Sequence, residues 1–186
     1  MDAPASLSGQ LLLAMPGIGD PRFEKAAIAM CAHDEKGAVG VALDRLVPQI
    51  GFHQLLDQLG IEPGLAPDRE IHLGGPVEQQ RGFLLHSTDW VGADTLLVEG
   101  RWGLTSTLDI LRAIAEGGGP RRWLVALGYA GWGEGQLDGE MRRHGWFATR
   151  GDDTILFERP ASQRWELAMR GAGIDPQLLA ATSGRA

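Results

Sequence analysis

The sequence predicts an α+β fold in which helices pack on a mixed β-sheet. Apolar runs paired across short polar turns predict hairpins, and single strand–glycine–helix units predict crossovers, so the elements do not alternate regularly. The chain has 186 residues, of which 44% are hydrophobic and 22% charged. That length is sufficient to bury most of its apolar surface in one domain. We expect residues 1–8 to form a disordered leader and residues 9–186 to form this domain.

The first third of the chain predicts a strand, a helical turn and a hairpin. Gln10–Met15 is a short apolar run, and Asp20-Pro21 is typical of a helix start. The apolar runs Ala26–His33 and Ala38–Leu43 flank the polar turn Asp34–Gly37. This arrangement is typical of a β-hairpin.

The middle third predicts a helix, two paired strands and a second hairpin. Leucines at helical spacing indicate a helix over 50–59, with Gly60 at its C-terminal cap. Glu70–Leu73 and Gly82–His86 are expected to be antiparallel neighbours. A hairpin is expected over 95–105, and Ser106 begins a further helix as a capping residue.

The last third contains the most distinctive segment. The apolar strand Trp123–Leu127 leads into the glycine-rich stretch Gly128–Gly135 and then into a helix near 136–144. Further strands are predicted at 146–149 and 154–157. A helix over 160–170 and a terminal helical turn that begins at Asp175-Pro176 complete the pattern.

Composition excludes several classes of protein. The net charge is −7, from 17 basic and 24 acidic residues, which disfavours diffuse binding to a phosphate backbone. Cys31 is the only cysteine, so an internal disulfide is excluded, as is usual in a reducing cytosol. The apolar runs are too short to span a bilayer, and the N-terminus lacks a basic signal region. We expect a cytoplasmic protein with no membrane association.

Several blocks of sequence resemble the YqgE/AlgH family of bacterial proteins. They occur in order from about Gly9 to the C-terminus, at consistent spacing: Leu12–Pro16, Cys31–His33 with Gly37–Gly40, Leu73–Val77 with Arg81–His86, Gly128–Leu137 with Glu140, and Ile174–Pro176.

The resemblance implies a strongly curved, partly barrel-like mixed sheet. It implies less about activity, because members are largely uncharacterised and some are labelled transcriptional regulators from a genetic link to exopolysaccharide control. One turn departs from the family pattern. Asp44-Arg45-Leu46 stands where relatives usually have Asn-Arg-Pro, which adds a charge if the turn belongs to a ligand site.

The glycine-rich stretch has two interpretations. It lacks the spacing of a dinucleotide-binding fingerprint and of a Walker A loop. Backbone geometry alone explains glycine at such turns, and a ligand pocket at the end of the strand is the alternative. On the second interpretation, the residues expected to bind the ligand are His33, Arg45, Gly74, Gly75, Arg81, Tyr129, Gly131, Trp132 and Gly133.

Cys31 and His33 lie two residues apart on a predicted strand, so their side chains are expected on one face. An imidazole at this position would lower the pKa of the thiol and make it reactive. A buried, inert cysteine is the other interpretation, and the apolar residues before it favour burial. His33, His72 and His86 could meet across a sheet, but their spacing matches no metal motif. No catalytic residue, metal or cofactor is predicted.

Three functions are consistent with the sequence. The first is a non-enzymatic cytosolic binding or regulatory protein whose partner is an unidentified small molecule or protein. The second is an enzyme of uncatalogued type or a thiol-based sensor that uses Cys31 and His33. Direct DNA binding is the third and is not favoured, because no known DNA-binding motif is present.

Overall fold

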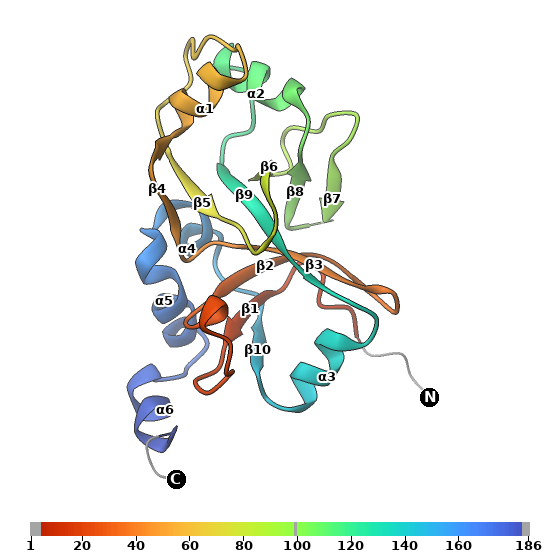
Figure 1. Ribbon diagram of the computed structural model, residues 1–186, viewed down its shortest axis with the longest axis vertical. Helices are drawn as coiled ribbons and strands as arrows, with labels where there is room; N and C mark the ends of the chain where they lie inside the picture. The colour runs from red at the N-terminus through yellow and green to blue at the C-terminus, as the bar shows by residue number, and fades with distance from the viewer. Residues whose placement is uncertain (1–4, 99, 184–186) are drawn as a thin grey trace.

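The computed structural model describes residues 5–98 and 100–183. It confirms the predicted α+β class: a large, strongly curved sheet is packed with helices, and the sheet stays open at its edge strands β10 and β7 (Figure 1). The strand order is β10-β1-β2-β3-β9-β6-β8-β7, and β4 joins this path through β5, which pairs with β9. All ten strands therefore form one hydrogen-bonded network.

Most strands are short and antiparallel to their neighbours. They are β1 (Leu11–Ala14), β2 (Ala27–Asp34), β3 (Gly37–Ala42), β4 (Leu46–Gly51), β5 (Glu70–Leu73), β6 (Val77–His86), β7 (Leu96–Val98), β8 (Trp102–Thr105), β9 (Trp123–Trp132) and β10 (Trp146–Thr149).

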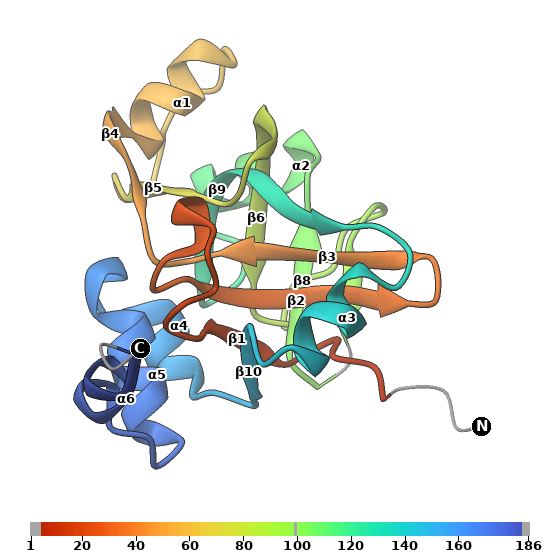
Figure 2. The same cartoon turned by 60° about the horizontal axis from the view of Figure 1, so that its bottom comes forward.

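The helices lie at the two ends and along one side of the sheet. The described helical elements are η1 (Pro21–Phe23), α1 (Phe52–Gln58), α2 (Leu108–Ala115), α3 (Gln136–Arg142), α4 (Asp153–Glu158), η2 (Ala161–Gln163), α5 (Arg164–Gly171) and α6 (Pro176–Ser183). Both views place α1 and α2 at one end, while α4, α5 and α6 gather on one side of β1 and α3 lies on the other (Figures 1 and 2).

Strand β9 joins the two halves of the sheet. Its first part pairs in parallel with β5, from Ile71 opposite Val125, and antiparallel with β6. Its last part pairs instead with β3, where Gly131 lies opposite Val39. The strand changes partner at Gly128, so the predicted strand does not end there but continues to Trp132.

Two glycines permit this change of partner. Gly128 has a φ of 76° and Gly75 a φ of 153°, a region that residues with a Cβ rarely adopt. A Cβ on Gly75 would also overlap the backbone of Tyr129. At these positions glycine is required by the close crossing of two backbone segments.

The core consists of three clusters of buried side chains. One lies between the sheet and α4 and α5, a second lies under α3 and contains Met30, Trp132 and Trp146, and a third lies under α1 and α2. Two tryptophans of the second cluster, Trp132 and Trp146, also line a groove on the molecule.

One predicted strand is a helix. Residues 154–157 were expected to be extended, but they belong to α4. The side chain of Asp152 accepts a hydrogen bond from the backbone N–H of Thr154 at 2.8 Å, which caps the helix. The paired aspartates are therefore a helix start and not a strand-connecting turn.

The predicted helix over 50–59 is present as α1, although it begins at Phe52, after strand β4, which was not predicted. Two other local predictions were wrong. β6 does not pair with β5, because β9 lies between them. Ser106 does not cap α2: Thr107 is the N-cap residue, and the Ser106 hydroxyl accepts a hydrogen bond from Arg81 at 3.1 Å.

The N-terminal segment contacts the β2–β3 hairpin. Residues 1–4 lie outside the described part of the chain, but Ser6 donates a hydrogen bond to the carbonyl of His33. Leu7 N–H donates to Nδ1 of the same histidine at 2.9 Å.

Among the described residues, no helix combines the length and apolar character that a membrane crossing requires.

Candidate ligand-binding groove

A groove of about 540 Å³ lies where the loop around η1 meets β9, α3 and β10. Its size is within the range of small-molecule sites, about 300–1,000 Å³. Its lining includes two residues predicted from the sequence, Gly131 and Trp132. The complete lining is Pro16, Gly17, Ile18, Asp20, Arg22, Phe23, Pro76, Val77, Gly131, Trp132, Gln136, Glu140, Arg143, His144, Gly145 and Trp146.

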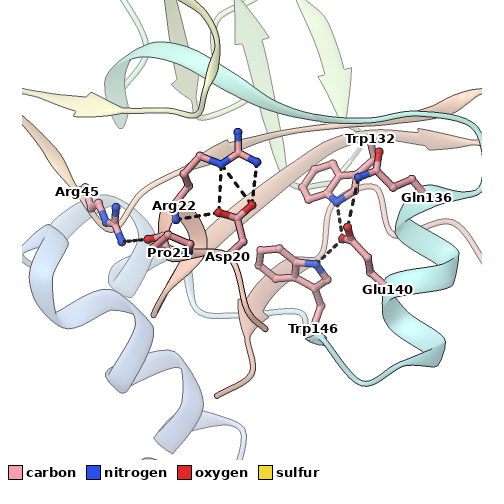
Figure 3. A network of polar contacts seen from close by, with 8 residues as sticks. All are labelled: Asp20, Pro21, Arg22, Arg45, Trp132, Gln136, Glu140 and Trp146. Atoms are coloured by element: carbon pink, nitrogen blue, oxygen red, sulfur yellow. Dashed lines mark hydrogen bonds and ion pairs between the residues drawn. The ribbon is translucent and has the colours of Figure 1, made fainter. Parts of the chain in front are cut away.

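The carboxylate of Glu140 is at the centre of a polar network in this groove (Figure 3). The indole N–H groups of Trp132 and Trp146 both donate to Oε2, each at 2.9 Å. Gln136 Nε2 donates to Oε1 at 3.3 Å. Glu140 forms no ion pair with any described residue, so neutral N–H donors replace the water that would otherwise solvate this anion.

The ends of two strands and the first turns of α3 bring these groups together. Trp132 ends β9 and Trp146 begins β10, so the two strand ends bring the indoles together at a ring separation of 6.0 Å. Gly135, with a φ of 67°, turns the chain into α3. Gln136 and Glu140 are four residues apart on that helix and therefore share a face.

The opposite wall of the groove is formed by η1 and the loop before it. Asp20 accepts a hydrogen bond from the backbone N–H of Arg22 at 3.0 Å, which caps η1. The Arg22 guanidinium bonds the same carboxylate at 2.8 Å and lowers the pKa of Asp20. Phe23 packs its ring edge-on against Trp146 at 5.6 Å and adds a third aromatic side chain to the groove.

Arg45 holds this wall in place. Its Nη2 donates to the carbonyl oxygen of Pro21 at 3.0 Å (Figure 3). It also donates to the carbonyl oxygen of Glu24 at 3.3 Å. It also lines a smaller cavity of about 90 Å³ together with Gly75. Arg22, Phe23 and Pro76 line both this cavity and the larger groove. Two further predicted residues thus lie beside the groove.

The turn that departs from the family pattern borders the smaller cavity. Asp44 accepts a hydrogen bond from the backbone N–H of Ala27 at 3.1 Å, and Arg45 Nε lies 3.7 Å from its other oxygen. Burial outweighs these contacts and raises the pKa of Asp44 to about 6. The carboxyl is therefore poorly stabilised as an anion at a position where relatives usually have a neutral amide.

A family model described as AlgH-like matches residues 11–177 of the chain. This chain belongs to the AlgH-like family. A UPF0301 protein of Rhizorhabdus wittichii is 75% identical to it over 186 residues, which is 100% of both chains. The solution structure of AlgH from Pseudomonas aeruginosa matches with a TM-score of 0.80 and 34% identity, and covers 97% of this chain and 96% of that one.

A more distant structure shares the AlgH-like fold. A crystal structure of a Corynebacterium diphtheriae protein matches with a TM-score of 0.75 at 19% identity and covers 96% of this chain and 94% of that one. None of these descriptions states a ligand or a reaction.

The other predicted glycines contribute backbone contacts. Gly74 N–H donates to the Leu127 carbonyl at 2.8 Å, and its own carbonyl accepts from Ala42 N–H at 2.8 Å. Gly133 N–H donates to Gln136 Oε1 at 3.0 Å, which holds the first turn of α3 next to Glu140. These residues shape the AlgH-like fold around the groove without lining it.

Tyr129 and Arg81 lie away from the groove. Tyr129 packs edge-on against Phe83 with ring centroids 5.7 Å apart. The guanidinium of Arg81 lies 5.1 Å from the centre of the same ring and contacts Glu78 at 3.5 Å. Neither residue lines the groove or the smaller cavity.

Cys31 and His33 have separate surroundings. A β-bulge at Cys31 interrupts the register of β2 and β3. Cys31 is 3% exposed, and burial raises the pKa of its thiol to about 12. His33 accepts a hydrogen bond from Leu7 N–H and lies 3.2 Å from Asp138, so both of its ring nitrogens are occupied. This environment argues against the thiol-based sensor.

The three histidines considered as metal ligands do not meet. His33 contacts Asp138, His72 lies next to Arg164, and Nε2 of His86 bonds Thr105 at 2.8 Å. Within the described ranges, no group of three or more His, Cys, Asp and Glu side chains has the geometry of a metal site.

Sequence reasoning missed most of the groove. Arg22, Phe23 and Trp146 were not singled out, and Glu140 was noted only as part of the family pattern. The available signals were the Asp20-Pro21 cap, which indicates a fixed loop, and the acid four residues after Gln136 on an amphipathic helix. Neither signal reveals that two tryptophans from different strands converge on Glu140.

Proposed function

We propose that this chain is a non-enzymatic, cytoplasmic binding protein whose groove holds a small ligand with a positively charged nitrogen. One observation carries the proposal: Glu140 is fixed by three N–H donors but has no cationic partner among the described residues. An anion held in this way is preorganised to accept a charged hydrogen bond from a ligand.

The aromatic walls support a cationic group. Trp132, Trp146 and Phe23 surround the carboxylate from three elements. A cation over an indole face is attracted by about 0.5–2 kcal/mol, and the same faces cover the apolar part of a small molecule. An ammonium or guanidinium group near Glu140 would gain from both contributions.

Charges at the rim favour a ligand that also carries an anionic group. Arg22 is already paired with Asp20. Arg143 lines the groove and forms no ion pair with any described residue. We therefore expect a zwitterion to bind more tightly than a simple amine of the same size.

The lining supports binding over covalent catalysis. It contains no Ser, Thr, Cys or Lys side chain, and its carboxylates are already engaged, Asp20 by Arg22 and Glu140 by three N–H donors. Any regulatory role, as the family resemblance implies, would then be indirect and would depend on ligand occupancy.

A ligand screen with one matched pair of variants tests the proposal. Thermal unfolding is measured with tetramethylammonium, primary amines and zwitterionic amino acids, because a ligand that binds the native state raises the melting temperature. At least one cationic compound should stabilise the wild type, and Glu140→Gln should remove that stabilisation. Glu62→Gln removes the same charge from an exposed position and is the control. Equal binding by both variants, or no stabilisation by any cationic compound, would refute the proposal.

A further inference from the structure

A second charged side chain, Arg164 at the start of α5, is almost fully buried. The residue is only 4% exposed. Its Nη1 donates to the carbonyl of Leu43 at 2.8 Å and contacts His72 Nε2 at 2.5 Å. These two contacts fix the orientation of the guanidinium between α5 and the sheet.

His72 is a neutral partner. Its Nδ1 lies 3.0 Å from the carbonyl of Val125, which can only accept, so Nδ1 carries the proton. Nε2 therefore presents a lone pair to Arg164. Burial lowers the pKa of His72 to about 4, with a further contribution from the charge of Arg164. The histidine orients the guanidinium but supplies no negative charge.

The rest of the guanidinium lacks a partner. Nε is buried and has no hydrogen-bond acceptor among the described residues. Arg164 also forms no ion pair within the described part of the chain: Glu70 and Asp44 attract it electrostatically, but neither contacts it within ion-pair distance. A buried guanidinium with an unbonded N–H group is unfavourable, because buried charged groups are normally hydrogen-bonded as well as paired. The incomplete bonding of this cation requires an explanation.

A cavity of about 530 Å³ lies next to this guanidinium and is lined by residues of β5, β9 and the α4–α5 segment. Two further arginines line it. Arg69 Nη1 donates to the Trp123 carbonyl at 3.1 Å, and its guanidinium lies 4.2 Å from the centre of the Trp123 ring. Arg159 is exposed and forms no ion pair with a described residue.

Three carboxylates also line the cavity, and two are already engaged. Asp68 accepts a hydrogen bond from His53 N–H at 3.0 Å, and Glu158 pairs with Arg122 at 3.4 Å. Glu70 attracts Arg164 electrostatically but forms no ion pair with it. Glu70 is therefore the carboxylate that would oppose an incoming anion.

We propose that this cavity binds an oxyanion, the carboxylate or phosphate group of a small metabolite, with Arg164 as the buried anchor and Arg69 and Arg159 at its mouth. The site is separate from the Glu140 groove and does not depend on it. Arginine suits this task because its planar fork matches both carboxylate and phosphate geometry.

Titration with inorganic phosphate and with succinate tests the site and distinguishes the two anion sources. The side-chain Nε–H signal of Arg164 is followed by NMR at constant ionic strength. At least one anion should shift it saturably in the millimolar range. Saturation by phosphate alone, by succinate alone or by both supports the site and identifies the chemistry of the ligand.

Matched charge variants make the test specific. Arg159→Gln should weaken binding about twofold to fivefold, as expected for one partly exposed ion pair. Glu70→Gln should tighten it, because an opposing charge is removed. Arg142→Gln, on the distant helix α3, should leave the affinity unchanged.

Two outcomes would overturn the proposal. One is the lack of a saturable shift with either anion, and the other is equal weakening by Arg142→Gln and Arg159→Gln, which would indicate nonspecific attraction. Arg164→Met should abolish binding. If that variant does not fold, the Arg159 and Glu70 variants decide, because both residues are exposed.

Discussion

Glu140 on α3 and Arg164 on α5 both lack an ion-pair partner among the described residues, but their surroundings differ. Glu140 is half-buried, and its two oxygens accept three N–H bonds. Arg164 is buried, and its Nε has no acceptor among the residues that the structure describes. The fold thus stabilises an anion by side-chain donors at one site and leaves a cation incompletely satisfied at the other. The hydrogen-bonded Glu140 should stabilise the fold without a ligand. At Arg164, a bound anion should raise the stability of the protein.

Glu140→Ala is expected to have the largest effect. It leaves the N–H groups of two buried tryptophans without their acceptor, and hydrogen bonds to a charged group contribute about 1.5–3 kcal/mol each. We expect the free energy of unfolding to fall by about 3 kcal/mol in urea denaturation. Glu140→Gln, which keeps one oxygen acceptor, should lose less. An unchanged denaturation midpoint for the alanine variant would show that the network does not stabilise the fold.

Asp44→Asn, which restores the usual family residue, should change the pH dependence of stability. The folded-state pKa of Asp44 is raised from 3.8 to about 6, so the folded protein holds a proton that the unfolded chain has lost. Wild-type stability should therefore fall as pH rises through this window. Between about pH 4.5 and about pH 7.5, the loss attributable to this group is about 2 kcal/mol.

The comparison of the two proteins isolates this effect. Denaturation at both pH values should show the Asp44→Asn variant gaining about 2 kcal/mol over the wild type on going to the higher pH. Contributions from other groups, including His72, cancel in the difference unless they are coupled to Asp44. Parallel pH profiles would mean that folding does not raise the pKa of Asp44, so that its carboxyl is ionised across the whole pH window.

Arg164→Met sharpens the comparison between the two charged residues. The substitution removes two hydrogen bonds but also removes a buried charge that forms no ion pair with a described residue. Replacement of buried charges by apolar side chains of similar size is often neutral or stabilising. We expect a gain of up to about 1 kcal/mol in anion-free buffer. A large loss of stability in thermal or urea denaturation would show that Arg164 is mainly a structural residue.

Cys31 should show no measurable reaction in the native state. Its thiol is buried, and its raised pKa keeps it protonated at neutral pH. Treatment with iodoacetamide should modify it only after denaturation, as measured by mass spectrometry. Rapid labelling of the folded protein would restore the thiol-based interpretation that the environment of His33 argues against.

The sequence predicted the elements better than their partners. The β2–β3 hairpin, the α3 helix and the cap at Asp20 all depend on residues a few positions apart, and all are found. The predicted pairing of β6 with β5 was wrong. β6 follows β5 in the sequence, but β9 lies between the two strands in the sheet. The choice between candidate neighbours depends on the long strand β9, whose continuation past Gly128 the local sequence does not reveal.

The groove was predicted only in part. Gly131 and Trp132 were found because glycine and aromatic residues cluster in one segment, while Trp146 and Phe23 carry no local signal. Those two residues are far apart in sequence and meet because β10 pairs with β1 and η1 folds back beside it. Arg164 was hidden for the same reason, since its contacts with Leu43 and His72 join distant segments.

By itself, the sequence determined the family and the α+β class, and it indicated unusual backbone as one interpretation of the glycine-rich stretch that begins at Gly128. The tertiary structure alone decided which charges are exposed, hydrogen-bonded or unpaired. Backbone preferences are set by interactions within a few residues. The solvation of a charge, in contrast, depends on every segment that surrounds it. The donors to Glu140 are close in sequence but lie on different elements, and the partners of Arg164, Leu43 and His72, come from distant parts of the chain.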